Sequence, residues 1–137
     1  MAAIGMNESP SPSLLQEHQC MWDQIKIIGD LTAEPRYDAH EILVAFHELV
    51  DLAQEHFGHE EEAMIDAAFP GMLLHQRDHA YLLRSLRDFI AALVDTAERP
   101  PSSLCDNLQS WFDFHRRRYD EVYLRFAEQR RTSGLTA

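Results

Sequence analysis

The nine residues HFGHEEEAM, at positions 56–64, combine two histidines with three glutamates. Imidazole nitrogens and carboxylate oxygens together suit iron, zinc, copper or nickel as ligands. A run of glutamates is also typical of a solvated helix face, and we interpret Glu61 and Glu62 in that way. The direction in which the histidines point therefore decides whether this stretch belongs to a metal site.

Eight histidines occur in the chain, and their faces can be compared at about 100° per helical residue. His40 and His47 fall on the face opposite the apolar stripes and His59 lies at the flank, so we expect these three to meet water. The remaining five share the apolar stripes with one glutamate, which gives six inward side chains: His18, His56, Glu60, His75, His79 and His115.

One histidine on an apolar stripe is more often a core residue bonded to a backbone carbonyl than a metal ligand. Five inward imidazoles in one small core would, however, leave many buried donors and acceptors unpaired, at about 1–3 kcal/mol each. A bound metal removes that cost. The combination therefore predicts a metal site in the core.

Two familiar classes of metal site do not fit the spacing. The zincin pattern HExxH fails at Ala63, and none of the histidines has the glutamate three residues before it that a ferritin-like di-iron site needs. Five imidazoles and a carboxylate also exceed what one tetrahedral zinc takes. Two metal ions explain this number of ligands better than one ion does.

Breaker residues divide the chain into four helical segments. The first runs from about residue 11 to 31, and the second opens at Asp38, which with Glu41 has the character of a capping box. The turn at 69–71 precedes the third segment, and ERPP at 98–101 precedes the fourth. Short connections force antiparallel neighbours, so we predict an all-α, up-down-up-down four-helix bundle over residues 11–131. Residues 1–10 and 132–137 are expected to be flexible.

Composition narrows the possible partners. The chain has 137 residues, long enough for one domain with its own core. Its net charge of −11 argues against binding to nucleic acid or to an anionic membrane surface. Cys20 and Cys105 form no CxxC pair and indicate reduced thiols, and neither a signal peptide nor an apolar run of about 20 residues is present. We expect a soluble cytoplasmic protein, monomeric or at most weakly self-associating.

Ordered motifs in the chain resemble those of the hemerythrin family. HFGHEEEAM is similar to the pattern HFxxEExxM, HQRDH at 75–79 to HxxxH, and WFDFHRRRYD at 111–120 to WxxxHxxxxD. Gln16-Glu17-His18 is a variant of the family's first-helix QH. The resemblance covers roughly residues 14–126, and the ordered set is far more specific than any one motif.

The resemblance implies two non-heme iron ions, bridged by an oxo or hydroxo group and by the carboxylates of Glu60 and Asp120. One iron would be completed by His75, His79 and His115. The other would be held by His18 and His56, with a position open for dioxygen. At 100° per residue Asp120 lies about 140° from His115, so its place in this set comes from the resemblance alone.

The family's pocket positions correspond to Phe57, Trp111, Phe112, Arg116 and Tyr123. An apolar shell of this kind keeps water and protons away from the irons. Arg116 departs from the family, which usually has isoleucine there. Either its stem covers apolar surface while the guanidinium reaches water or an acidic neighbour, or it enters the pocket and stabilises a bound anion or peroxide.

The leading expectation is therefore reversible dioxygen binding, for storage, delivery or sensing, by a protein that is not an enzyme. One alternative is a di-iron enzyme that reduces peroxide or nitric oxide with an external electron donor. Another is a helical interaction module with zinc or with no metal.

Overall fold

The computed structural model describes residues 11–136, and the side chains of residues 14–133. The predicted flexible segment 1–10 lies outside the described residues. The elements follow one another as α2 (Ser11–Ala33), α3 (Ala39–Asp66), α4 (Met72–Thr96), α5 (Leu104–His115), a π-helix η1 (Arg116–Asp120) and α6 (Glu121–Thr136).

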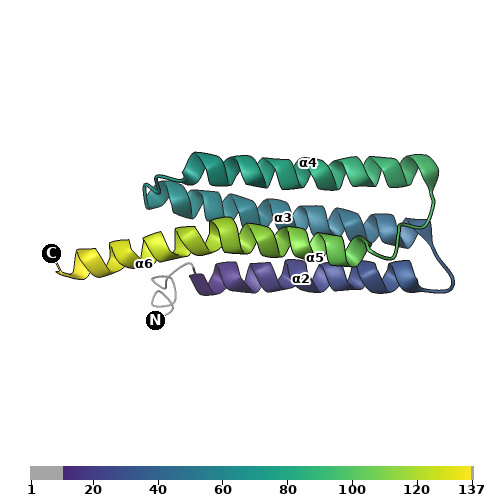
Figure 1. The fold of residues 1–137 in the computed structure, drawn as a ribbon, viewed down its shortest axis with the longest axis horizontal. Helices are drawn as coiled ribbons and strands as arrows, with labels where there is room; N and C mark the ends of the chain where they lie inside the picture. The colour runs from purple at the N-terminus through teal and green to yellow at the C-terminus, as the bar shows by residue number, and fades with distance from the viewer. Residues whose placement is uncertain (1–10, 137) are drawn as a thin grey trace, which may run out of the picture.

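Because α5, η1 and α6 follow without a break, the described residues form four helical rods. This confirms the all-α four-helix bundle. Figure 1 shows the connections between successive rods at alternate ends of the bundle, so that consecutive rods run in opposite directions. α3 packs against both α2 and α4, and α2 also packs against α5. Among residues 11–136, none of the helices combines the length and the apolar character needed to cross a membrane.

The helix ends follow local sequence signals at most positions. The Asp38 carboxylate caps α3 by accepting hydrogen bonds from the backbone N–H of His40 at 2.9 Å and of Glu41 at 3.4 Å. The turn predicted at 69–71 separates α3 from α4. α6, in contrast, continues to Thr136, beyond the end predicted near residue 131. A single glycine in a helix costs only about 1 kcal/mol, and the Thr132 hydroxyl donates to the Glu128 carbonyl at 3.0 Å, so helix continues there.

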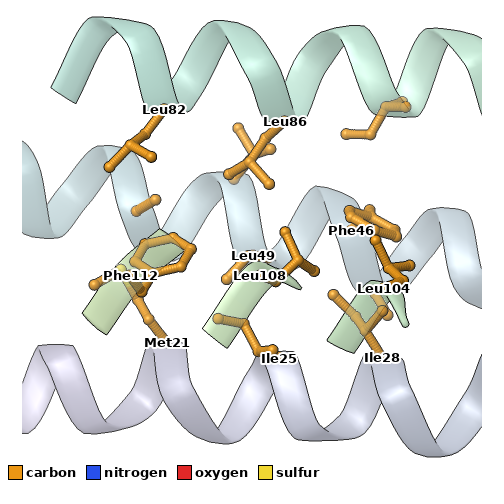
Figure 2. Close-up of a cluster of buried hydrophobic side chains, with 14 of the residues drawn as sticks. Met21, Ile25, Ile28, Phe46, Leu49, Leu82, Leu86, Leu104, Leu108 and Phe112 are labelled. Carbon is orange, nitrogen blue, oxygen red and sulfur yellow. The ribbon is translucent and has the colours of Figure 1, made fainter. Parts of the chain in front are cut away.

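Apolar side chains form two buried clusters. The larger one joins all four rods and includes Met21, Ile25, Leu49, Leu86 and Phe112 (Figure 2). A smaller cluster contains Leu14, Met64 and Tyr123. Along α3, His56 and Glu60 fall between Ala53 of the larger cluster and Met64 of the smaller one. The buried polar residues are therefore enclosed by apolar packing toward both ends of the bundle.

The π-helix changes the register of the fourth rod. Its defining bond runs from the Glu121 N–H to the Arg116 carbonyl, five residues back instead of four. One extra residue therefore occupies the turn, and the inward position moves from 122 to 123. Val122, which regular periodicity places on the apolar stripe, is 46 % exposed, whereas Tyr123 is 2 % exposed.

Candidate metal centre

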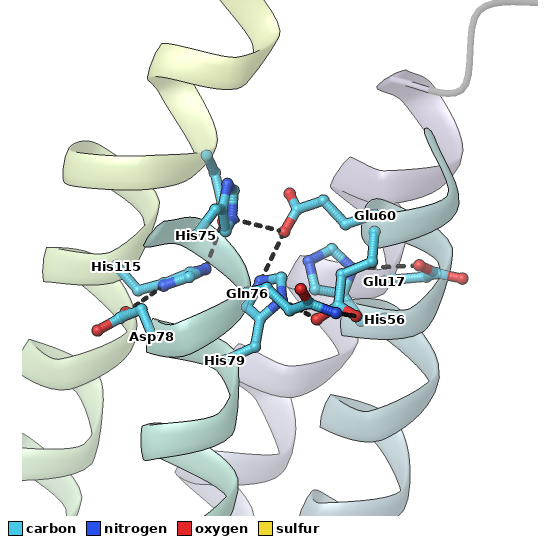
Figure 3. Close-up of polar contacts among 10 residues, drawn as sticks. Glu17, His56, Glu60, His75, Gln76, Asp78, His79 and His115 are labelled. Carbon is cyan, nitrogen blue, oxygen red and sulfur yellow. Dashed lines mark hydrogen bonds and ion pairs between the residues drawn. The ribbon is translucent and has the colours of Figure 1, made fainter. Parts of the chain in front are cut away.

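Five buried side chains converge in the interior of the bundle, from α3, α4, α5 and η1. Figure 3 shows Glu60, His75, His79 and His115 among them. One ligand atom from each lies within 4.8 Å of the corresponding atoms of the others. We call this set the metal-binding cluster; its members are Glu60, His75, His79, His115 and Asp120.

Two carboxylate oxygens organise the cluster. Glu60 Oε1 lies 3.0 Å from His75 Nε2 and 3.0 Å from His79 Nε2. Asp120 Oδ1 lies 2.9 Å from His75 Nε2 and 2.9 Å from His115 Nε2. His75 therefore connects the two carboxylates, and all three Nε2 atoms face inward.

The π-helix places Asp120 in the cluster. In a regular α-helix residues five apart point about 140° apart, so Asp120 and His115 would not meet. Because η1 accommodates five residues in one turn, the two side chains instead lie one above the other and touch at 2.9 Å. For this reason, the period of a regular α-helix does not predict the position of Asp120.

His18 and His56 form a separate pair beside the cluster. Their ring centroids are 6.0 Å apart, and the Nε2 atom of each is buried without a hydrogen-bond partner among the described residues. Burial lowers the pKa of His18, although the nearby Asp120 carboxylate acts in the opposite direction. Helix faces predict six of the seven proposed ligands. Five of the seven form the metal-binding cluster, and His56 and the partly buried His18 lie beside it.

Carboxylates on neighbouring helices bind the outward Nδ1 atoms of three of these rings. Glu17 of α2 lies 3.1 Å from His56, Glu61 of α3 lies 2.7 Å from His79, and Asp78 of α4 lies 2.5 Å from His115. Glu61 is therefore not simply a solvated residue as expected, because the imidazole of α4 packs over it; Glu62 is exposed.

The positions of these three carboxylates in the sequence could have identified them. Each adjoins a predicted ligand in the chain, in the pairs Glu17 with His18, Glu61 with Glu60, and Asp78 with His79. One residue along a helix turns the side chain by about 100°, from the core toward the next helix. An acidic neighbour of an inward ligand is thus suited to hold the imidazole on the adjacent helix.

In the metal-free cluster, contacts between imidazoles and carboxylates shift the pKa values of both kinds of group. Burial alone would raise the pKa of Glu60 and Asp120, but hydrogen bonds with the imidazoles outweigh it and hold both pKa values below their usual range. Burial would lower the pKa of His115, whereas its contacts with Asp120 and Asp78 raise that pKa to about 9. The pKa of His75 rises against burial for the same reason, through Asp120 and Glu60.

The donor set fits a bound cation. His79 and His115 each have carboxylate oxygens at both ring nitrogens. A neutral imidazole has one N–H and one lone pair. In each of these rings, one nitrogen lone pair therefore faces a carboxylate oxygen, which is repulsive unless a proton or a cation lies between them. His115 Nε2, although 2.9 Å from Asp120, also lacks a hydrogen bond of good geometry. When Nδ1–H donates to the outer carboxylate, the Nε2 lone pair is free to bind a metal.

Aromatic rings cover the imidazoles. Phe57 stacks on His79 with centroids 4.0 Å apart and lies 5.6 Å from the His115 ring. Phe112 and Tyr123 are each 2 % exposed and belong to the two apolar clusters. Tyr119, which the motifs did not single out, stacks on His115 at 5.4 Å.

Two predicted pocket residues lie elsewhere. Trp111 packs edge-on against Tyr81 of α4 at 6.1 Å and borders a cavity between α4 and α5. The Arg116 guanidinium binds Asp113 at 2.7 Å and Glu121 at 2.5 Å. Arg116 therefore adopts the alternative in which it pairs with acidic neighbours, because a guanidinium is better satisfied by two carboxylates and water than by an apolar pocket.

The histidines expected to meet water do so. His40 and His47 are exposed, and His59 is 51 % exposed while its Nδ1 lies 2.6 Å from Glu17. Their exposure separates them from the five inward histidines.

Comparison with known proteins identifies a matching family. The family model described as Hemerythrin HHE cation binding domain matches residues 9–127. Neither the curated proteins nor the solved structures contain a significant match to the chain. The matched range contains the whole metal-binding cluster and both histidines of the adjacent pair.

Proposed function

The chain belongs to the hemerythrin family of HHE cation-binding domains, and on that premise we propose that it holds two iron ions and binds dioxygen reversibly. The observation that carries this proposal is the convergence of five buried ligand atoms within 4.8 Å, next to two further imidazoles whose Nε2 atoms have no hydrogen-bond partner within the described residues. Seven donors exceed the needs of one ion.

The residues divide between the ions by position. His75, His79 and His115 would hold one ion, and His18 and His56 the other. The carboxylates of Glu60 and Asp120 would serve both and offset part of their charge. A pair of ferrous ions, when bound, supplies the electrons that dioxygen binding requires.

The chain's own residues support this role by protecting the site. Phe57 lies 5.9 Å from the His56 ring and 4.0 Å from the His79 ring, so one aromatic side chain covers a histidine of each proposed ion. Tyr123, Leu14 and Met64 close the opposite end. Excluding water and protons favours release of intact dioxygen over loss of a reduced oxygen species that leaves the metal oxidised.

Iron analysis and oxygen cycling test the proposal. The full chain is loaded with ferrous iron without oxygen, and we expect close to two irons per chain and an absorption change in air that reverses when oxygen is removed. His56→Ala should lower the iron content and abolish the reversible change, whereas His47→Ala, on the exposed face, should retain both. Zinc as the only metal, or a change in air that cannot be reversed, contradicts the proposal.

The enzymatic alternative loses its specific support. A free positive charge of Arg116 near the metals would favour that alternative by stabilising bound peroxide, but Asp113 and Glu121 pair with this charge. Steady-state consumption of peroxide or nitric oxide by the iron-loaded protein with a reductant would nevertheless reveal such an activity.

A further inference from the structure

A cavity of about 670 Å³ lies between the start of α4 and the segment formed by η1 and α6. Its volume is in the range of small-molecule sites, roughly 300–1,000 Å³. Phe69, Leu74, Phe114 and Val122 give it an apolar lining, while His75 and Tyr119 form the wall that it shares with the metal-binding cluster. We call it the α4–η1 cavity.

The α4–η1 cavity is basic in an acidic protein. Acidic residues outnumber Lys and Arg by 23 to 12 in the chain, yet among the described side chains Arg117 and Arg118 line the cavity and no carboxylate does. Arg117 pairs with Asp113 at 3.0 Å. The Arg118 guanidinium lies 5.9 Å over the Phe114 ring, and no carboxylate among the described side chains forms an ion pair with it.

The N-terminus of α4 adds positive potential to the same cavity. Gly71, its N-cap, supplies no side-chain hydrogen bond, and the first turn contains no acidic residue. Unpaired backbone N–H groups and the helix dipole favour an anion at such an end. The helix end and the arginines thus attract the same charge.

The imidazole of His75 supplies an independent sign of a missing ligand. This side chain is 1 % exposed, it borders the cavity, and its Nδ1 atom is buried without a hydrogen-bond partner in the described part of the chain. His56, His79 and His115 each have a carboxylate at Nδ1. When Nε2 of His75, which faces Glu60 and Asp120, binds a metal through its lone pair, the ring proton lies on Nδ1 and can be donated outward.

We propose that the α4–η1 cavity binds a small organic carboxylate with an apolar body. Its carboxylate pairs with Arg118 and accepts the Nδ1–H of His75, and its apolar part packs against Phe69, Phe114 and Val122. The ligand thereby supplies to His75 the acceptor that the protein itself supplies to the other rings. The pair with Arg118 and the apolar contacts require no metal; the hydrogen bond from His75 and the effect on the metal centre rest on the proposed function.

Fluorescence titration of the full, metal-free chain with 2-naphthoate tests the site. We expect one naphthoate per chain, and affinity at least about tenfold weaker for the uncharged 2-naphthalenemethanol and for Arg118→Gln, since a charged pair contributes enough free energy for that factor. Val122→Trp fills the cavity from a partly exposed position and should abolish binding. Arg87→Gln, an exposed position on α4 outside the cavity, is the matched charge control and should bind as the original chain does.

Equal affinities for naphthoate and the alcohol, or equal affinities of the Arg118 and Arg87 variants, overturn the proposal. Helical circular dichroism verifies that each variant folds. In iron-loaded protein, naphthoate should shift the iron absorption bands in the original chain but not in Val122→Trp. If naphthoate binds without shifting the bands, the proposed contact with His75 is wrong. If the protein does not load iron, the titration of the metal-free chain still decides whether the cavity binds a carboxylate.

Discussion

At the scale of single residues, the outward ring nitrogens are as organised as the inward ones. Glu17, Glu61 and Asp78 each hold the imidazole of another helix, at 3.1, 2.7 and 2.5 Å. A carboxylate at Nδ1 fixes the tautomer and the ring orientation and makes Nε2 a stronger ligand. These carboxylates therefore belong to the metal site although they face away from it.

Asp78→Asn should weaken metal binding by about 10- to 100-fold, the usual effect of losing such a partner. The amide keeps the shape of the side chain but removes the negative charge beside His115. Competition with a chelator of known affinity measures the change. Asp88→Asn, an exposed position on the same helix, is the control, and equal affinities of the two variants would contradict the role of Asp78.

The metal-free protein should lose stability on the alkaline side. The pKa of His115 is raised from 6.5 to about 9 in the folded state, so its contribution is complete below pH 6.5 and disappears as the pH rises to 9. At about 1.4 kcal/mol per pKa unit, this loss is at most roughly 3–4 kcal/mol. Asp120, whose pKa is lowered from 3.8, contributes above that pH and ceases to do so in acid. Stability is therefore greatest between these limits.

Chemical unfolding of chelator-treated protein at several pH values measures this profile. His115→Gln should flatten the decline between pH 6.5 and pH 9, because the group whose pKa spans that interval is gone. His47→Gln, an exposed histidine of α3, should leave the decline unchanged. A profile that is flat in the original chain would show that the contacts of His115 do not stabilise its charged form.

At the scale of elements, the π-helix determines which residues of the fourth rod reach the core. It is one residue longer than the α-helical turn it replaces. Deleting Arg117, which is 64 % exposed, should convert η1 to an α-helical turn while His115 and Asp120 remain in line. We expect this variant to fold with unchanged or higher thermal stability and to retain the metal.

Deleting Ser110 from the regular helix α5 is the matched control. It rotates the two parts of the rod by about 100° relative to each other, so either Leu108 or His115 leaves the core, and we expect loss of the folded state. If both deletions unfold the protein, the π-helix is not a one-residue insertion in an otherwise regular helix.

The same element marks the limit of helical periodicity. A period of 3.6 residues correctly predicts His56, Glu60, His75, His79 and His115 as buried. Beyond Arg116 it places Asp120 outside and Val122 inside, and both assignments are reversed in the structure. The segment HRRRYD contains no glycine or proline that would indicate a departure from the regular α-helix. Asp120 of the π-helix contacts two imidazoles, a tertiary contact that helical periodicity does not predict and that only the motif WxxxHxxxxD indicated.

At the scale of the whole molecule, helical periodicity does not predict which residues of different helices contact each other. Helix faces predict that Trp111 and Phe112 both point toward the core, and they do not predict that Trp111 also packs against Tyr81 while only Phe112 is fully buried. In the same way Glu61 appears solvated until α4 packs His79 over it. Sequence therefore specifies which residues face inward, whereas packing specifies which partner each one meets.

Removing the metal should leave the bundle folded but less stable. Apolar clusters lie on both sides of the metal-binding cluster, and 137 residues are enough for a core that needs no metal to fold. A ligand that binds only the folded state adds about 4 kcal/mol at a thousand times its dissociation constant. We therefore expect chelation to preserve helical circular dichroism and to lower the midpoint of thermal unfolding.

Two variants separate the contribution of the core from that of the metal. Leu49→Ala, a fully buried position of the larger apolar cluster, should destabilise the metal-free and metal-loaded proteins equally, by about 2–5 kcal/mol. His56→Ala should reduce the difference between the two forms, because it removes a proposed ligand. A chain that unfolds completely on chelation would mean that the two apolar clusters cannot hold the four rods together across the charged interior, and that metal binding and folding are one event.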